Sequence, residues 1–456
     1  MLQAAEKSAA YHAAMESITS KELAAYVEHL ADDEMQGREA GTRGGRAAAD
    51  YLTMRFAELR LVAAGNDGGY QQPLPPHFRN ILGMIPGNDP ELKNEVIVVG
   101  AHYDHVGFGN SRNSFGPYGR IHHGADDNAS GTAALLEFAE AFNFLPEPPK
   151  RSILVAAWDA EEKGLLGSKY WVSHPTVPLK KIVATFNLDM IGRLRNDHLY
   201  IYGSRSGCGW RRLVSRHNDT LGLHIEFLWS MKPIADHYPF FEHGIPVLMF
   251  HTGVHDNYHR PSDTADLING EGMSRLVRLL FSVVYELAES NEKIPYRKAA
   301  SRETPQTEKL LLEQVIRPAE RLGVALNVKP AAEGGVRLLR VISGSPADKA
   351  GLKPGCRIIR CTGREVNCDD DLIGAVMTAD SPVQLLLQNE GEEKPSEISV
   401  ELTGQPLRLG ITWRVDDAEP GAIILSYVVP GTPAARAGLQ AGDRIYQIAG
   451  QDFADE

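Results

Sequence analysis

Two adjacent aspartates, Asp126 and Asp127, stand in the stretch GADDNASG among residues that are otherwise small or polar. Asp, Asn, Ser and Gly are the residues that turns favour, so one interpretation is a surface turn. The other is a metal site, in which cations relieve the repulsion between the carboxylates and the small side chains leave room for the ions. The neighbouring strands decide between these interpretations.

Acidic residues and histidines follow several apolar, strand-like runs. The runs lead into His102, Asp104 and His105 in HYDH, into Asp159, Glu161 and Glu162 in DAEE, into Asp189 in NLDM, and into His259 in HTGVHDNYHRPSD. Taken singly, such residues can be hydrogen-bonded core groups, solvated loop residues or helix caps. Because ligand sites in open α/β sheets lie beyond the carboxyl ends of strands, all of them together predict one functional site.

The elements that must position these residues alternate along roughly the first 290 residues, which is typical of an α/β fold with helices on the faces of a sheet. Strands are expected in NILGMIPG from Asn80, EVIVVGA from Glu95, RSILVAAW from Arg151, KIVATFNL from Lys181 and IPVLMF from Ile245. Helices are expected at 21–30, 45–60, 130–142 and 271–289, the last with apolar residues at helical spacing.

The composition narrows the class of protein. A chain of 456 residues predicts two to four domains, and 43% hydrophobic with 23% charged residues is typical of a globular protein. A net charge of −12 without a basic block argues against nucleic-acid binding. No apolar run is long enough for a membrane span, and the N-terminus has no apolar segment typical of a signal peptide. The four cysteines are expected to be mostly buried thiols, with a disulfide among Cys356, Cys361 and Cys368 left open.

An internal repeat follows a polar stretch near residue 300. RLGVAL from Arg321 recurs as RLGITW from Arg408, and GSPADKAGLKPGCRI from Gly344 recurs as GTPAARAGLQAGDRI from Gly431, both at an offset of 87 residues. The repeat resembles PDZ domains, whose loop N–H groups bind the C-terminus of a peptide or protein partner while that segment adds a strand to a sheet edge. The resemblance implies peptide-binding loops at Leu322, Gly323 and Val324 and at Leu409, Gly410 and Ile411.

Roughly residues 20–290 resemble the co-catalytic zinc aminopeptidases, which include bacterial leucyl aminopeptidases and have glutamate carboxypeptidases and glutaminyl cyclases as relatives. The segments MQGREAGTRGG, GAHYDH, GADDNASG, DAEEKGLLGS, NLDMIG, ADHYPFFEHGIPV and YHRPSDT carry the resemblance, in that order along the chain. It implies a three-layer zinc-exopeptidase domain with a central mixed, mostly parallel sheet, followed by small β-rich PDZ domains.

The resemblance also implies a set of metal ligands. His102 and Asp189 would hold one zinc, Glu162 and His259 a second, and Asp126 would bridge the pair, with Co²⁺ or Mn²⁺ as substitutes. In that family the peptide bond between the two residues taken as Asp126 and Asp127 is typically cis.

Glu161 is expected to be the general base beside the bridging water. Asp104, and by analogy Asp263, are expected to accept the second N–H of the ligand histidines. His237 is expected either to stabilise an oxyanion or to be a structural histidine, the two being equally favoured. His122 and His123, which precede the aspartate pair, are unusual there and are expected to shape the pocket.

These residues predict a catalytic domain at 1–295, a linker at 296–307, a PDZ domain at 308–402 and a second PDZ domain at 405–456 that ends before its last helix and strand, as a truncation would leave it. The function favoured is removal of N-terminal amino acids from a peptide substrate. The alternatives are a glutaminyl cyclase, which uses a single zinc, and a non-catalytic PDZ-based binding protein. Export from a bacterial cell is the expected location, although no targeting segment supports it.

Overall fold

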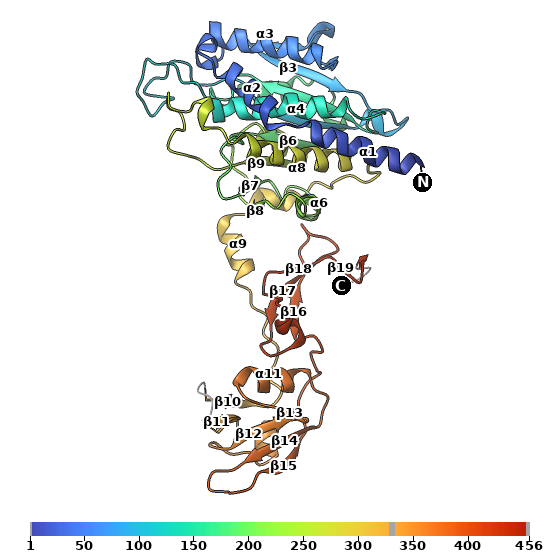
Figure 1. Ribbon diagram of the computed structural model, residues 1–456, viewed down its shortest axis with the longest axis vertical. Coiled ribbons are helices and arrows are strands. Elements are labelled where there is room, and N and C mark those ends of the chain that lie inside the picture. Colours follow the sequence, from blue (N-terminus) through green and yellow to red (C-terminus); the bar gives the residue numbers. More distant parts are fainter. Residues whose placement is uncertain (1, 328–332, 453–456) are drawn as a thin grey trace. The chain divides into compact units, whose positions relative to one another are not determined.

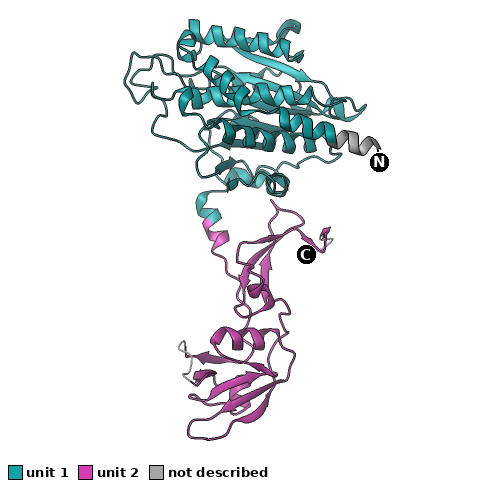
Figure 2. Cartoon of the chain, in the orientation of Figure 1, with its two compact units in different colours: residues 1–308 teal, residues 309–456 magenta. Residues whose placement is uncertain are grey.

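The computed structural model describes residues 2–327 and 333–452, and the chain divides into two compact units, residues 1–308 and 309–456 (Figure 2). Each unit has its own sheets and its own buried core. Within the described ranges, no helix has both the length and the apolar character that crossing a membrane requires.

A nine-stranded mixed sheet forms the centre of the first unit (Figure 1). Its strands are β1 (Val62–Ala63), β2 (Gln71–Leu74), β3 (Phe78–Ile85), β4 (Val96–His102), β5 (Ser152–Trp158), β6 (Ile182–Leu188), β7 (His198–Tyr202), β8 (His224–Leu228) and β9 (Val247–His251). Their order is β1-β3-β5-β4-β6-β9-β7-β8, with β2 beside β3. The central strands β5, β4, β6 and β9 run parallel to one another, so their carboxyl ends lie at the same edge.

The central strands are apolar on both faces because helices cover both faces. Alternate residues such as Ile97, Val99 and Val155 pack into one large core with helices of the first layer. These helices are α1 (Leu2–Ser17), α2 (Ser20–Leu30), α3 (Arg43–Glu58), α4 (Gly131–Phe142), α6 (Trp210–Asn218) and α8 (Gly270–Glu289).

The opposite face of the sheet carries a second layer of two short helices. Val98, Leu154 and Trp158 point to this side and pack against α5 (Leu166–Ser173) and α7 (Tyr238–Glu242), through Trp171 and Phe240. The unit is therefore three layers deep, and the predicted α/β fold with a central mixed sheet is confirmed.

The elements that the sequence did not predict lie mostly at the edges of this unit. The five expected strands are β3, β4, β5, β6 and β9, whereas β7 and β8 are half-exposed strands without a continuous apolar run. Helices α5 and α7 have eight and five residues, too few for helical periodicity to show.

The segment expected as a linker, 296–307, packs on the first unit over most of its length. Tyr296 pairs with Gly207, and Arg205 and Arg297 both form ion pairs with Glu303. The helix α9 (Pro305–Leu312) follows. Arg297 and Glu303 of this stretch thus pair within the first unit, which composition alone cannot distinguish from the charged residues of a solvated linker.

The second unit contains the predicted repeat. The first copy comprises β10 (Val324–Leu326), β11 (Val336–Val341), α10 (Pro346–Lys349), β12 (Arg357–Cys361), β13 (Arg364–Glu365), α11 (Asp369–Thr378), β14 (Val383–Gln388) and β15 (Ser396–Val400). The second comprises β16 (Ile411–Arg414), β17 (Ile423–Val428), α12 (Pro433–Arg436), β18 (Arg444–Ile445), β19 (Gln447–Ile448) and β20 (Gln451–Asp452). Strand β17 corresponds to β11, and helix α12 to α10, at the offset of 87 residues seen in the sequence. Residues 453–456 of the predicted second domain lie outside the described residues.

A groove runs between β10 and α11 of the first copy and is also lined by Tyr427 and Val429 of the second. Leu322, Gly323 and Val324 line it together with Ile373 and Val376 of the helix. In the second copy, Leu409 is 57% exposed and Ile411 is buried in a small core. Cys356, Cys361 and Cys368 are free thiols and form no disulfide with one another.

Trp158 packs so closely against β4 that a larger residue at Gly100 is expected to destabilise the domain. A Cβ added there would lie 2.4 Å from the Trp158 Nε1 atom, and Trp158 is already packed against Trp171 and Phe240. Gly100→Ala should therefore lower the free energy of unfolding by about 1–3 kcal/mol, measured by denaturant titration. Gly69→Ala, where the nearest atom is 3.4 Å away, is the matched control and should stay within about 0.5 kcal/mol of the unmodified chain.

Candidate metal centre

The parallel central strands bring the polar residues that follow them to one edge of the sheet. His102 is the last residue of β4, Asp189 is the first after β6, and Glu161 and Glu162 follow β5. His259 lies on the loop that follows β9. Six of the eight residues predicted from the strand ends, all except Asp104 and Asp159, lie within two groups that could each hold a metal ion.

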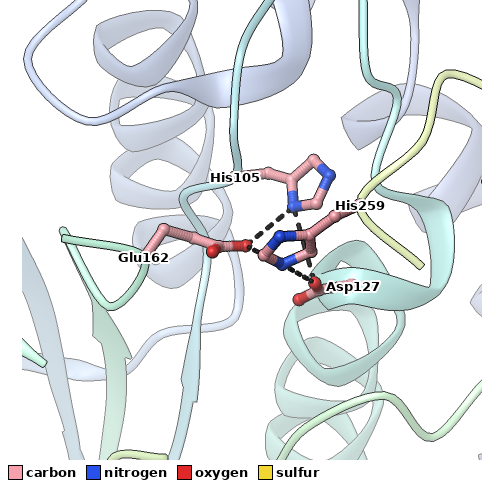
Figure 3. Close-up of side chains that lie close together, drawn as sticks. All are labelled: His105, Asp127, Glu162 and His259. Atoms are coloured by element: carbon pink, nitrogen blue, oxygen red, sulfur yellow. Dashed lines mark hydrogen bonds and ion pairs between the residues drawn. The ribbon is translucent and has the colours of Figure 1, made fainter. Parts of the chain in front are cut away.

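The first group consists of His105, Asp127, Glu162 and His259, which converge from four separate segments (Figure 3). We call it the His105 group. His259 Nε2 lies 3.0 Å from Asp127 Oδ2 and 3.1 Å from Glu162 Oε1. His105 Nδ1 lies 3.0 Å from Glu162 Oε1 and 3.7 Å from Asp127 Oδ2.

The second group consists of His102, Glu161 and Asp189, and we call it the His102 group. His102 Nε2 lies 3.5 Å from Asp189 Oδ1 and also 3.4 Å from Asp127 Oδ1. Asp127 thus turns one carboxylate oxygen toward each group. Its side chain lies between the two positions that metal ions could take.

Asp126, which the sequence analysis took as the bridging residue, is turned away from both groups. Its Oδ1 accepts the N–H of Gly192 at 2.6 Å, and its Oδ2 lies 3.1 Å from His255 Nε2. The expected cis peptide bond also lies one residue later, between Asp127 and Asn128. The segment Ala125–Ser130 is a π-helical turn with non-helical residues inside it, and such a turn has no periodicity from which the inward-facing carboxylate could be predicted.

Asp263 fixes the backbone of this turn. Its Oδ2 accepts the N–H groups of Asp126 and Asp127 at 3.0 and 3.1 Å. Burial and the neighbouring Asp126 raise the pKa of Asp263 to about 6. The expectation that Asp263 accepts an N–H of His259 is wrong, because His259 Nδ1 donates instead to the backbone carbonyl of Asn113 at 3.0 Å.

Asp104 acts on both sides of the site, in part through its backbone. His102 Nδ1 donates to the Asp104 carbonyl at 3.1 Å, whereas the Asp104 carboxylate is 3.7 Å from the same nitrogen. Asp104 Oδ1 accepts the backbone N–H of Glu161 at 2.9 Å. The backbone carbonyl of Asp104 thus fixes the His102 tautomer that carries its proton on Nδ1 and leaves Nε2 free toward the His102 group. The Asp104 carboxylate instead positions the loop that carries Glu161.

Arg38 connects the loops around the site through hydrogen bonds to their backbone. Its guanidinium is fully buried and donates to the carbonyls of Leu30, Tyr103, His123 and Gly124 at 2.6–2.9 Å. Burial lowers the pKa of Arg38 to about 10, although nearby carboxylates, Asp127 first among them, oppose that change. One cation therefore binds three other backbone segments, at Leu30, Tyr103 and His123–Gly124, while it offsets part of the negative charge of the site.

His122 and His123 have structural roles beside the site. His122 Nε2 lies 2.5 Å from the Ser114 hydroxyl, and that hydroxyl donates to the carbonyl of His259 at 3.1 Å. His123 Nδ1 donates to the carbonyl of Ala31 at 2.9 Å. His122 thereby holds the loop before the aspartate pair against His259.

His237 is fully buried, and neither ring nitrogen has a hydrogen-bond partner among the described residues. Burial lowers its pKa to about 4, so the ring is neutral at pH 7. The preceding Asp236 accepts a hydrogen bond from Ser168, and burial raises its pKa to about 7. A purely structural histidine would bond to neighbouring groups. Among the described residues, His237 makes no such hydrogen bond.

The charges of the two groups leave an excess of buried negative charge. Burial raises the pKa of Glu161 well above its usual value, and Glu162 and Asp236 raise it further against the effect of His102. Burial lowers the pKa of His259, but Asp127 and Glu162 outweigh burial and raise it to about 11. The carboxylates thus raise the pKa values of His102 and His259, where bound cations would otherwise balance the negative charge.

This donor set fits zinc. Imidazole nitrogens and carboxylate oxygens are ligands that zinc commonly takes, and the distances of 3.0–3.5 Å between them lie near those of atoms sharing one ion. His102 and His259 each have their other ring nitrogen bound to a backbone carbonyl, as histidine ligands usually do.

Comparison with known proteins gives the same family. Residues 80–284 match the model of peptidase family M28, and residues 424–456 match that of the PDZ domain. The chain carries an M28 peptidase domain. The family named from the motifs is therefore confirmed, and so is the C-terminal PDZ domain.

Two curated relatives match the M28 domain over comparable lengths. Aminopeptidase YwaD of Bacillus subtilis is 29% identical over 47% of this chain and 46% of its own length, and leupeptin-inactivating enzyme 1 of Streptomyces exfoliatus is 30% identical over 46% of this chain and 43% of its own. This chain thus spans less than half the length of each. The LapA aminopeptidase of Legionella pneumophila shares the fold, with 21% identity and a TM-score of 0.52 over 62% of this chain and 74% of its own.

His105 and His255 are buried histidines near the aspartate pair to which the sequence analysis gave no role of their own. His105 stands in HYDH, three residues after His102, so its residue type marked it as a candidate ligand. The direction of its side chain could not be predicted, because the strand ends at His102 and the regular alternation of side chains ends with it. His255 is the partner of Asp126.

The orientation of the aspartate pair predicts different effects of two neighbouring substitutions. Asp127→Asn should lower the zinc content of the purified chain from two equivalents to one or fewer, because it removes charge between both groups. Asp126→Asn should leave the zinc content unchanged, since its side chain faces Gly192 and His255. Elemental analysis after gel filtration makes the measurement, and the reverse ranking would restore Asp126 as the residue shared by the two groups.

Proposed function

We propose that this chain is a dinuclear zinc aminopeptidase whose PDZ region binds a peptide or protein partner. The carboxylate of Asp127 is the observation that carries the proposal, because its two oxygens face two separate groups of zinc-type ligands. The residues that would hold the ions are His102 and Asp189 on one side and Glu162 and His259 on the other. The names of the relatives of the M28 domain, which include aminopeptidases, support the reaction type.

Zinc bound in this site would polarise the scissile carbonyl and lower the pKa of a water molecule toward neutrality. Glu161 then acts as the proton carrier, taking a proton from the water and later giving one to the leaving amine. Its backbone is fixed by the hydrogen bond to Asp104, and its carboxylate lies in the His102 group, within 4.8 Å of the His102 and Asp189 ligand atoms. The burial that raises the pKa of Glu161 suits a group that must hold a proton between the two transfers.

The acidic surroundings of the site suit a free α-amino group. Asp189 and Asp236 both lie close enough to Glu161 to influence its pKa, so a positive charge placed near them is favoured. His237, neutral and without a partner in this part of the chain, is the residue available to donate a hydrogen bond to a developing oxyanion.

The PDZ region is proposed to bind peptide C-termini in the groove of the first copy. An extended peptide would add a strand beside β10, and Leu322, Gly323 and Val324 would offer backbone N–H groups to its carboxylate. The apolar side chains of Ile373 and Val376 would contact the C-terminal side chain.

Glu161→Gln tests the reaction. The substitution keeps the size of the side chain and removes its ability to take a proton, so turnover of an aminoacyl-p-nitroanilide should fall about 10²–10⁴-fold while both zinc ions stay bound. Turnover is measured by absorbance and zinc by elemental analysis.

Glu162→Gln is the matched control, because Glu162 lies in the His105 group and its loss should remove metal as well as activity. A chelator should abolish hydrolysis, and added zinc should restore it. Zinc-loaded protein that cleaves neither aminoacyl-nitroanilides nor longer peptides would contradict the proposal. One zinc per chain together with cyclisation of N-terminal glutamine would support the glutaminyl cyclase alternative instead.

Ile373→Lys tests the PDZ groove. Ile373 is half-buried on α11, and a charge there should weaken binding of a fluorescent peptide with a free apolar C-terminus at least tenfold, since it places an ammonium in an apolar site. Leu339→Lys is the control, because Leu339 is 65% exposed and lies outside the groove. Unchanged peptide affinity in Ile373→Lys, measured by anisotropy, would place the peptide elsewhere.

A further inference from the structure

The His105 group offers four ligand-type atoms, whereas the His102 group, with Glu161 kept as a proton carrier, offers His102 Nε2 and Asp189 Oδ1 together with the second oxygen of Asp127. The four atoms of the His105 group are His105 Nδ1, His259 Nε2, Asp127 Oδ2 and Glu162 Oε1, all within 4.8 Å of one another. The four distances measured between them are 3.0, 3.0, 3.1 and 3.7 Å. Four atoms bound tetrahedrally to one zinc, at the usual bond lengths of about 2.0–2.2 Å, stand about 3.3–3.6 Å from each other.

We propose that His105 is a direct metal ligand, so that the zinc of the His105 group is held by four protein side chains. The other zinc would be held by three side-chain atoms, His102 Nε2, Asp127 Oδ1 and Asp189 Oδ1, with Glu161 beside them as the proton carrier. This inference rests on the proposed dinuclear function and goes beyond it, because it makes the two zinc sites chemically different. A closed four-ligand set is typical of zinc that stays bound, whereas an open position is typical of zinc that takes part in catalysis.

The fold fixes the His105 ring with one nitrogen toward the group. The backbone N–H of His105 donates to the carbonyl of Arg38 at 3.3 Å, and the ring lies edge-on to His259 with centroids 5.5 Å apart. Gly124 leaves the space that the ring fills, since a Cβ at that position would lie 2.4 Å from His105 Cδ2. The ring is buried, and its Nε2 has no partner among the described residues, so Nδ1 is the nitrogen that faces Glu162 and Asp127.

The net charge of the group also suits a bound ion. Glu162 contributes one negative charge, and Asp127, whose other oxygen faces the His102 group, contributes part of a second, so the two carboxylates offset most of the charge of one divalent cation. If His105 were only a hydrogen-bond donor to Glu162, the ion would have three protein ligands in each group and the sites would be alike. The two roles can be separated because they require different atoms at the position of Nδ1.

Two isosteric substitutions distinguish these roles. In His105→Asn, the amide NH₂ takes the place of Nδ1 and can donate to Glu162 but cannot ligate zinc through nitrogen. In His105→Asp, a carboxylate oxygen takes that place and can ligate zinc but cannot donate. If His105 is a ligand, His105→Asn should release one zinc to a chelator at least tenfold faster than the unmodified full-length protein, and His105→Asp should retain it.

The reverse ranking, with zinc retained by His105→Asn and lost from His105→Asp, would overturn the proposal. His123→Asn is the matched control, because His123 lies outside both groups and bonds the Ala31 carbonyl, and both zinc ions should stay bound. Unfolding midpoints of the metal-free proteins check that each variant folds.

A measurement on the unmodified protein keeps the proposal testable if a variant fails to fold. In the protein loaded with two equivalents of Co²⁺, each ligated histidine gives one imidazole N–H proton resonance shifted far outside the normal range. Three such resonances are expected, from His102, His105 and His259, and two would overturn the proposal. Failure to bind a second cobalt would count against the dinuclear function itself, which separates the two failures.

Discussion

Buried carboxylates that repel one another are the constraint on which the M28 domain depends. Asp127 and Asp189, which are buried, meet Glu161 and Glu162, which are half-buried, beyond the ends of three adjacent strands. Without metal ions the imidazoles of His102 and His259 balance part of this charge, which is why their pKa values are raised against the effect of burial. Protons and zinc compete for the same atoms, so zinc affinity should fall as pH decreases.

The surrounding structure holds these groups in place with few side chains. Arg38 binds four backbone carbonyls, Asp263 binds two backbone N–H groups of the aspartate turn, and Asp104 binds the N–H of Glu161. The loops of the site are thus tied together by charged groups bonded to peptide atoms. Such contacts keep a charged cluster rigid before any ion binds, as a preorganised site requires.

Part of this arrangement could be predicted from the sequence. Strands β4, β5 and β6 are buried on both faces and therefore appear as continuous apolar runs, and the residues that follow them were found for that reason. The choice between Asp126 and Asp127 could not be predicted, because the turn that carries them is irregular. The groups that accept the second N–H of His102 and of His259 are backbone carbonyls. Every residue has such a carbonyl, so these partners could not be identified from side-chain types.

Asp127 is expected to be shared by two zinc ions. Anomalous X-ray diffraction at the zinc absorption edge, from crystals of the zinc-loaded full chain, measures the number and positions of these ions. The shared arrangement predicts two anomalous peaks about 3.5–4 Å apart, one on each side of the Asp127 carboxylate. A single peak, or two peaks that flank Asp126 instead, would contradict it.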